Sequence, residues 1–294
     1  MKLENKIHKS CPICNDTKFN NLVNYSKFHL VKCSNCKLIY AHYIPSKEDL
    51  VKHYSKYGRN DYLSPITIKR YHEILDSFEK YRKYNRLLDV GAGIGLFLEV
   101  AKERGWEVYG TEYTQEAINI CTNKGIVMKQ GALTEELFPK AYFDVITSFE
   151  VIEHTSYPQT DIQLIYDFLK PSGILYLTTP NFNSIVRRFL KSKWNVIAYP
   201  EHLSYFTKKS MHFALTKNNF KKLYLKTQGI SITRISTSKN KSNEKFISAT
   251  SQDEKIRISI ENSKFKVLIK NIINITLSIT GSGDTIKALY VKKE

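Results

Sequence analysis

The residue types that could do chemistry gather at three places along this chain of 294 residues. Four cysteines lie near the N-terminus in two pairs, and a glycine-rich turn follows residue 90. A third group combines a carboxylate, an imidazole and a phenol in Glu201, His202 and Tyr205. These groups suit metal binding, close approach of a ligand to the main chain, and proton transfer.

The four cysteines have the spacing of a metal site. Two C-x2-C pairs, separated by eighteen residues, are formed by Cys11, Cys14, Cys33 and Cys36. Each pair can present two thiolates to one ion, and a short hairpin from Phe19 to Val31 would bring the pairs together. Four cysteines with no open position predict a tetrahedral structural Zn²⁺; iron or a redox-active pair is the alternative.

The glycine-rich turn has the form of a nucleotide-binding loop. It joins an apolar strand around Leu87 and Leu88 to a helix opening at Leu96, and Glu112 ends the next strand, where it could bind ribose hydroxyls. The glycines alternate: Gly91, Gly93 and Gly95. Asp89 lies two residues before them, where its carboxylate would repel a pyrophosphate and attract a ligand carrying an ammonium and a sulfonium. An NAD enzyme, or another α/β protein with a glycine turn, is the alternative interpretation.

This turn resembles motif I of the class I S-adenosylmethionine (SAM) methyltransferases. The resemblance implies an α/β fold with a Rossmann-like, seven-stranded, mostly parallel sheet. It also implies that Gly131-Ala132-Leu133 contacts the adenine, and that Phe149, Glu150 and His154, in the family's "EVIEH" signature, line the same cleft. The cofactor residues expected on these grounds are Asp89, Gly91, Gly93, Gly95, Glu112, Leu133, Phe149, Glu150 and His154. His154 could instead cap the following helix.

The string Glu201-His202-Leu203-Ser204-Tyr205-Phe206, together with the four cysteines, resembles the nucleotide-sugar C-methyltransferases. That resemblance implies His202 as the general base, with Glu201 and Tyr205 as further catalytic candidates, and a nucleotide sugar or surface-glycan precursor as acceptor. The alternative is that this string forms a turn with only a structural role, in which His202 is exposed to solvent. The hundred-residue C-terminal domain of that family does not follow here, so O-methylation is equally plausible.

Two other functions are weighed against a small-molecule methyltransferase. The cysteine segment and the net charge of +17 would suit an RNA methyltransferase. Asn181-Phe182 after Pro180, however, lacks the N-P-P-Y or D-P-P-Y tetrad that serves base amino groups, which makes nucleic acid the less favoured partner. A non-enzymatic SAM-fold subunit is disfavoured by the intact glycines, Asp89 and Glu112.

The alternating pattern predicts the elements that position these residues. Strands are expected near 86–90, 106–111, 126–129, 142–149, 173–179, 221–234 and 284–292. Helices are expected over 46–57, 64–84 and 208–217, and from starts near Gly95, Thr114, Thr134 and Gln159. The predicted organisation is a zinc-binding ribbon (1–45), a helical arm or lid (46–85) and a SAM-binding domain (86–294).

Charge and composition bear on partners and on location. There are 45 Lys+Arg against 28 Asp+Glu, which suggests an anionic partner, although scattered lysines without a patch would give the same count. Residues 253–280 are basic and amphipathic, so they could lie on a membrane surface or pack over the sheet. No apolar signal core follows the N-terminus, so a cytoplasmic location is expected. The oligomeric state does not follow from the sequence.

Overall fold

The computed structural model describes residues 6–46, 63–231, 235, 238 and 252–293, and everything below concerns these residues. The expected helix over 46–57, and with it the first part of the predicted lid, lies outside this range except for Ser46.

A seven-stranded sheet in the order β12-β13-β10-β9-β6-β7-β8 forms the centre of the fold. Only β13 runs antiparallel to its neighbours β10 and β12, whereas the other neighbouring pairs are parallel. The strands are β6 (Arg86–Val90), β7 (Glu107–Glu112), β8 (Val127–Gln130), β9 (Phe143–Phe149), β10 (Leu169–Pro180), β12 (Phe220–Gln228) and β13 (Thr285–Lys292). The expected seven-stranded, mostly parallel sheet is therefore confirmed.

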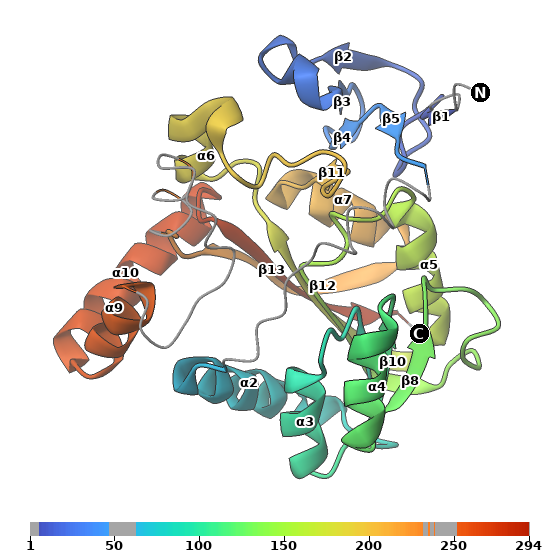
Figure 1. The fold of residues 1–294 in the computed structure, drawn as a ribbon, viewed down its shortest axis with the longest axis vertical. Coiled ribbons are helices and arrows are strands. Elements are labelled where there is room, and N and C mark those ends of the chain that lie inside the picture. Colours follow the sequence, from blue (N-terminus) through green and yellow to red (C-terminus); the bar gives the residue numbers. More distant parts are fainter. Residues whose placement is uncertain (1–5, 47–62, 232–234, 236–237, 239–251, 294) are drawn as a thin grey trace.

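Helices cover both faces of this sheet (Figure 1). On one face, α2 (Pro65–Phe78), α3 (Leu96–Glu103) and α4 (Gln115–Asn123) pack against side chains such as Leu87 and Val145. On the other face, α5 (Pro158–Phe168) and α7 (Lys208–Lys217) pack against the following residues, Leu88 and Ile146. Successive apolar residues of β6 and β9 thus point to opposite faces, as they must in a strand that is buried on both sides.

The 3₁₀ helix η2 (Glu79–Tyr81) directly follows α2 and precedes β6. After the carboxyl end of β10 come α6 (Ile185–Leu190) and the 3₁₀ helix η3 (Lys191–Lys193). Helix α10 (Lys264–Thr280) packs against the outer strand β12, and α9 (Gln252–Glu261) packs against α10. Helix α9 contacts the start of α2, because Ser64, the N-cap of α2, donates to the buried carboxylate of Glu254. None of the helices in the described ranges is long and apolar enough to span a bilayer.

One predicted helix is wrong. The chain from Gly131 to Tyr142 forms turns and bends instead of a helix beginning near Thr134. Pro139 comes five residues after Thr134, and proline disfavours helical geometry in the residue before it, so less than two turns could form. Leu133 and Phe138 are nevertheless buried, because the turns carry them into the core.

The N-terminal segment forms a small sheet that includes a distant part of the chain. The strands β2 (Phe19–Asn21), β3 (Leu30–Cys33) and β4 (Ile39–Ala41) are joined by β11 (Ser204–Tyr205) in the order β11-β4-β3-β2. The expected hairpin is confirmed by the antiparallel β2–β3 pair, with the 3₁₀ helix η1 (Val23–Phe28) between its strands. A separate pair is formed by β1 (Lys6–Ile7) and β5 (Tyr43–Ile44).

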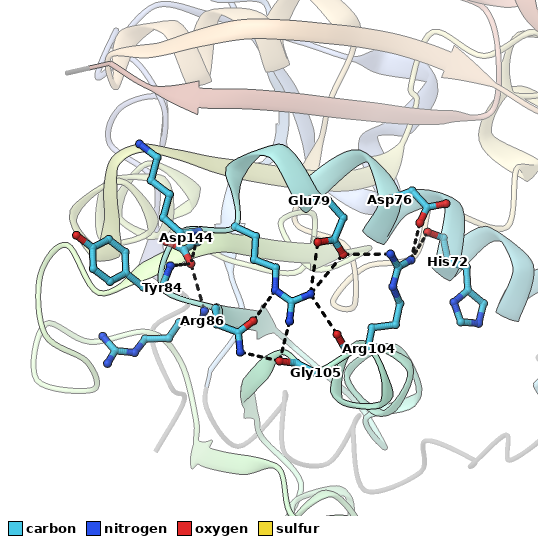
Figure 2. Close-up of polar contacts among 11 residues, drawn as sticks. His72, Asp76, Glu79, Tyr84, Arg86, Arg104, Gly105 and Asp144 are labelled. Carbon is cyan, nitrogen blue, oxygen red and sulfur yellow. Dashed lines mark hydrogen bonds and ion pairs between the residues drawn. The ribbon is translucent and has the colours of Figure 1, made fainter.

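A polar network fastens α2 to the sheet (Figure 2). Arg104 contacts the carboxylate of Asp76 at 2.8 Å and that of Glu79 at 3.1 Å, and it donates to the main-chain carbonyl of His72. Asp144, at the amino end of β9, accepts from the main-chain N–H groups of Lys83, Tyr84 and Arg86. The network lies at the amino ends of the strands, which leaves their carboxyl ends for the site.

Candidate active site

The three glycines of the turn all adopt positive φ, with three different surroundings. A Cβ on Gly91 would lie 2.5 Å from Val151, and one on Gly95 would lie 2.8 Å from Cys121 Sγ. A Cβ on Gly93 would meet no atom within 4 Å. Gly91 and Gly95 therefore allow close packing, whereas Gly93 faces open space at the carboxyl end of β6, where a ligand can approach the main chain.

Asp89 lies inside the sheet rather than on the surface of the turn. Its side chain is 3% exposed, and its Oδ1 accepts a 2.7 Å hydrogen bond from Thr147 on β9. Burial raises the pKa of Asp89 to about 7; the charge of Glu112 adds to this effect and the hydrogen bond opposes it. A cationic ligand at this edge would stabilise the charged carboxylate and would therefore lower the pKa of Asp89.

Glu112, at the end of β7, is held against the glycine turn. Its Oε2 accepts from Gly93 N–H at 3.0 Å, and its Oε1 accepts from Tyr113 N–H at 2.7 Å and from Thr114 N–H at 3.3 Å. A carboxylate has about four lone-pair positions, so these three bonds fix its orientation and leave capacity for a hydroxyl donor. Glu112 is thus in direct hydrogen-bond contact with the glycine turn.

The end of β9 combines an aromatic cluster with a strained backbone. Phe149 packs edge to face on Phe97 with ring centroids 4.9 Å apart, and it also contacts Tyr71 of α2 and Tyr176. Glu150 follows with φ of 54°, and its N–H donates to Thr178 O at 3.0 Å. Phe149 therefore packs inward, while the chain turns sharply at Glu150.

The sequence motifs "EVIEH" and "EHLSYF", nearly fifty residues apart, are joined directly. The carbonyl of Glu153 accepts from the N–H groups of Leu203 and Ser204, at 2.7 and 3.0 Å. His154 Nδ1 lies 2.9 Å from Glu201 O. The Glu201-His202 segment is therefore placed beside the end of β9 by main-chain bonds.

His154 and His202 form a pair with defined tautomers. Their rings meet edge to face with centroids 4.5 Å apart, and His202 Nδ1 lies 2.7 Å from Val196 O. Because a carbonyl oxygen can only accept, each Nδ1 must carry the proton. In the neutral form of either ring the lone pair is therefore on Nε2, the atom that can take a proton from another group.

Two groups of side chains lie close enough together to hold a metal ion. The four Sγ atoms of Cys11, Cys14, Cys33 and Cys36 all lie within 4.8 Å of one another, and the pairs Cys11–Cys36 and Cys14–Cys33 are 3.5 and 3.4 Å apart. Sulfurs bound tetrahedrally at ~2.3 Å would be about 3.8 Å apart, so the cluster fits zinc with little adjustment. The second group, with ligand atoms also within 4.8 Å, is Glu153, His154 and His202.

The other expected site residues are buried or half-buried. Tyr205 is buried, and its hydroxyl donates to His202 O at 3.1 Å, so it holds the main chain of the neighbouring histidine. Leu133 is 8% exposed and belongs to the apolar core. Glu201 is half-buried, and its carbonyl is the acceptor for His154.

Two residues of this region did not stand out in the sequence. Glu153 is 2% exposed, and its carboxylate accepts from Thr179 at 2.9 Å. Because Glu153 directly precedes His154 in the "EVIEH" string, its position beside that histidine could have been recognised from the sequence. Tyr71 of α2, whose pKa is raised to about 12 by burial and by the charge of Asp89, had no signal, because its nearness to the turn depends on tertiary packing.

Comparison with known proteins identifies the family. A family model described as a methyltransferase domain matches residues 62–225, more than half of the chain. Curated relatives include the mitochondrial ubiquinone biosynthesis O-methyltransferase of Mus musculus, 36% identical over 106 residues (33% of this chain, 29% of the relative). The ubiquinone biosynthesis O-methyltransferase of Haemophilus ducreyi is 31% identical over 138 residues (43% and 56%). The matched segments thus span little more than half, or less, of these relatives.

Solved structures agree on the fold. A SAM-dependent methyltransferase from Archaeoglobus fulgidus superimposes with a TM-score of 0.52 at 19% identity, covering 84% of this chain and 100% of that one. Phosphoethanolamine N-methyltransferase 2 of Haemonchus contortus, solved with SAM, gives 0.53 at 18% identity, covering 85% and 58%. These structures share the fold of SAM-dependent methyltransferases with this chain. The family-model match over more than half of the chain shows that it belongs to the methyltransferase-domain family.

Proposed function

We propose that this enzyme transfers the methyl group of SAM to a hydroxyl of a small phosphate-bearing acceptor, a nucleotide sugar or surface-glycan precursor, with His202 as general base. The observation that carries the proposal is the joining of the Glu201-His202 segment to the end of β9, which sets His202 against His154. Oxygen is favoured over carbon because the curated relatives are named as O-methyltransferases.

The chemistry is an in-line displacement. The acceptor oxygen forms a bond to the methyl carbon while the bond from that carbon to the sulfonium sulfur breaks, which leaves S-adenosylhomocysteine. The acceptor proton passes to His202 Nε2, since its Nδ1 is already engaged with Val196 O. Tyr205 and His154 act as positioning residues. Tyr205 donates to the carbonyl of His202, and His154 donates to the carbonyl of Glu201.

The cofactor would bind across the carboxyl ends of β6, β7 and β9. In this proposal Gly93 receives the methionine moiety against the main chain, Glu112 accepts from the ribose hydroxyls, and Asp89 faces the cationic part of the cofactor. Glu150 and the turn at Leu133 border the adenine side. Gly91 and Gly95 shape the loop without a direct contact.

The four cysteines are proposed to hold a structural Zn²⁺. A full set of thiolates leaves no position for a reacting water, so the ion would take no part in the chemistry. Its contribution would be to fix the small sheet of β2, β3, β4 and β11, the last of which begins two residues after His202.

The test measures S-adenosylhomocysteine formation with a panel of nucleotide sugars, and then the effect of His202→Ala on the best acceptor. We expect kcat to fall about 100-fold or more, the usual range for a lost general base, while SAM affinity measured by calorimetry is retained. His72→Ala is the matched control, because His72 contributes its carbonyl to the network of Figure 2. An unchanged kcat in His202→Ala would reject the base assignment.

A precursor of ubiquinone is the second candidate acceptor, favoured by the names of the curated relatives. It belongs in the same panel, with phenolic acceptors beside the nucleotide sugars. Turnover of phenols alone would replace the sugar proposal and leave the methyltransferase assignment in place.

A further inference from the structure

Helix α10 exposes an apolar stripe along its whole length. Phe265, Leu268, Ile272 and Ile279 are 70%, 56%, 56% and 78% exposed, and Ile269 is 41% exposed. Their spacings of three, four or seven residues place them on one side of the helix. A stripe of this length is unusual on a soluble surface and marks an interaction site.

The opposite side of α10 fixes the helix to the protein. Leu277 is buried, its carbonyl accepts from Thr227 of β12, and Asn274 accepts from Gly229 N–H at 3.0 Å. Lys270 pairs with Glu261 of α9. The helix is therefore held with its apolar stripe turned outward.

Helix α6 lies near the C-terminal end of α10 and also exposes apolar side chains (Figure 1). Ile185 donates its N–H to Ser282 O at 2.9 Å, which joins the two elements. Ile185 and Phe189, one helical turn apart, are 51% and 73% exposed. Arg188 of α6 and Lys264 and Lys266 of α10 lie among these residues, and α10 contains no Asp or Glu.

A strongly basic cavity opens beside the end of this stripe. Its volume is about 790 Å³, and Ile279 is part of its lining. Its cationic lining residues are Lys32, Lys37, Arg187, Lys208 and Lys209. Among the described residues, no Asp or Glu lines it.

Two of the cations of this cavity, Lys208 and Arg187, are held by neutral partners. Lys208 Nζ donates to Ser278 O at 2.7 Å, and Arg187 donates to Phe182 O and to the hydroxyl of Tyr25. Carbonyl and hydroxyl oxygens orient a cation without cancelling its charge. The cavity is therefore built for an anionic group, for which phosphate is the natural match in size and charge.

We propose that the enzyme docks on a bilayer containing anionic phospholipids, with α10 lying in the interface and lipid phosphates entering the basic cavity. This proposal does not depend on the acceptor. A second copy of the chain fits less well, because a two-fold contact through this surface would bring cation against cation. Nucleic acid fits less well because it would leave the apolar stripe in water.

The experiment is co-sedimentation of the full-length enzyme with phosphatidylcholine vesicles, with and without phosphatidylglycerol. We expect binding to the anionic vesicles that weakens with salt, and little binding to phosphatidylcholine alone. The variant Leu268→Asn/Ile272→Asn should lose binding. Lys32→Gln/Lys209→Gln should weaken it about fivefold for each lysine removed.

Matched controls separate docking from folding. Val127→Asn changes an exposed apolar residue at the far edge of the sheet, and Lys140→Gln changes an exposed lysine; both should bind vesicles like the wild type. SAM binding should be retained in all four variants, which shows that they are folded.

Three results would overturn the proposal. The first is a wild type that ignores anionic vesicles. The second is a concentration-dependent dimer that Leu268→Asn/Ile272→Asn abolishes, which would assign the stripe to a second copy. The third is RNA binding that depends on Lys32 and Lys209 while vesicle binding does not.

Discussion

At the scale of single residues, Asp89 carries the clearest consequence. Its pKa, raised to about 7 mainly by burial, means that the cofactor-free protein holds a proton there below neutral pH. A sulfonium or ammonium beside it favours the carboxylate, so SAM bound in the proposed position should release that proton.

We therefore predict that SAM affinity depends on pH through Asp89. Below about pH 7 the dissociation constant should rise by up to about tenfold per pH unit, and above it the affinity should level off. Calorimetry between pH 5.5 and 8.5 measures this. In Asp89→Asn the affinity should be lower and its pH dependence flattened; a wild-type profile in that variant would assign the titration to another group.

At the scale of elements, the four-stranded sheet links the cysteines to the proposed base. Cys33 ends β3, β3 pairs with β4, and β4 pairs with β11, which begins two residues after His202. Loosening the cysteine cluster would therefore disturb the Glu201-His202 segment, whereas Asp89 and Glu112 belong to the seven-stranded sheet and Gly93 to the turn after β6.

Removal of the proposed zinc should separate turnover from cofactor binding. Treatment with a chelator, or Cys36→Ser, should lower kcat strongly while SAM affinity stays near that of the wild type, and added zinc should restore the chelated enzyme. Metal analysis should give one zinc per chain. Full turnover without metal would refute the link.

The elements that could be predicted from sequence are those whose pattern is local. Strands such as β6 and β9 are marked by continuous apolar runs, and the glycine turn is marked by spacing. The pairing of β11 with β4 could not be predicted in this way, because a strand of two residues is too short to show a periodic pattern. The helix expected at Thr134 failed for the same reason: its local pattern was too short to outweigh Pro139.

The same limit applies within the site. Asp89, Glu112 and His202 stood out because their types and spacing resemble known motifs. The bond from His154 to Glu201 depends on how the chain returns after β10, and the place of Tyr71 depends on the packing of α2. Both are products of tertiary structure.

At the scale of the whole molecule, the two ends of the sheet have separate tasks. The network of Figure 2 ties α2 and β9 together at the amino ends, and the site lies at the carboxyl ends. The carboxylate of Asp144 is central to this network, because its residue is 2% exposed and it accepts from three main-chain N–H groups.

Asp144→Ala should therefore destabilise the protein without harming the site. Three N–H groups would lose their acceptor, and we expect the free energy of unfolding to fall by about 2–4 kcal/mol in urea titrations. Asp76→Ala is the control: its side chain is 67% exposed, so its ion pair with Arg104 should contribute less than about 1 kcal/mol. Equal losses in both variants would contradict this distinction.

The pairing of Tyr40 with Ser204 also sets an order of events during synthesis. These residues are 164 positions apart, so the N-terminal sheet cannot gain its last strand until residues 204 and 205 have left the ribosome. Until then the edge of β4 is unpaired. Until residues 204 and 205 are available, the cysteines and the unpaired edge of β4 must not bind other partners.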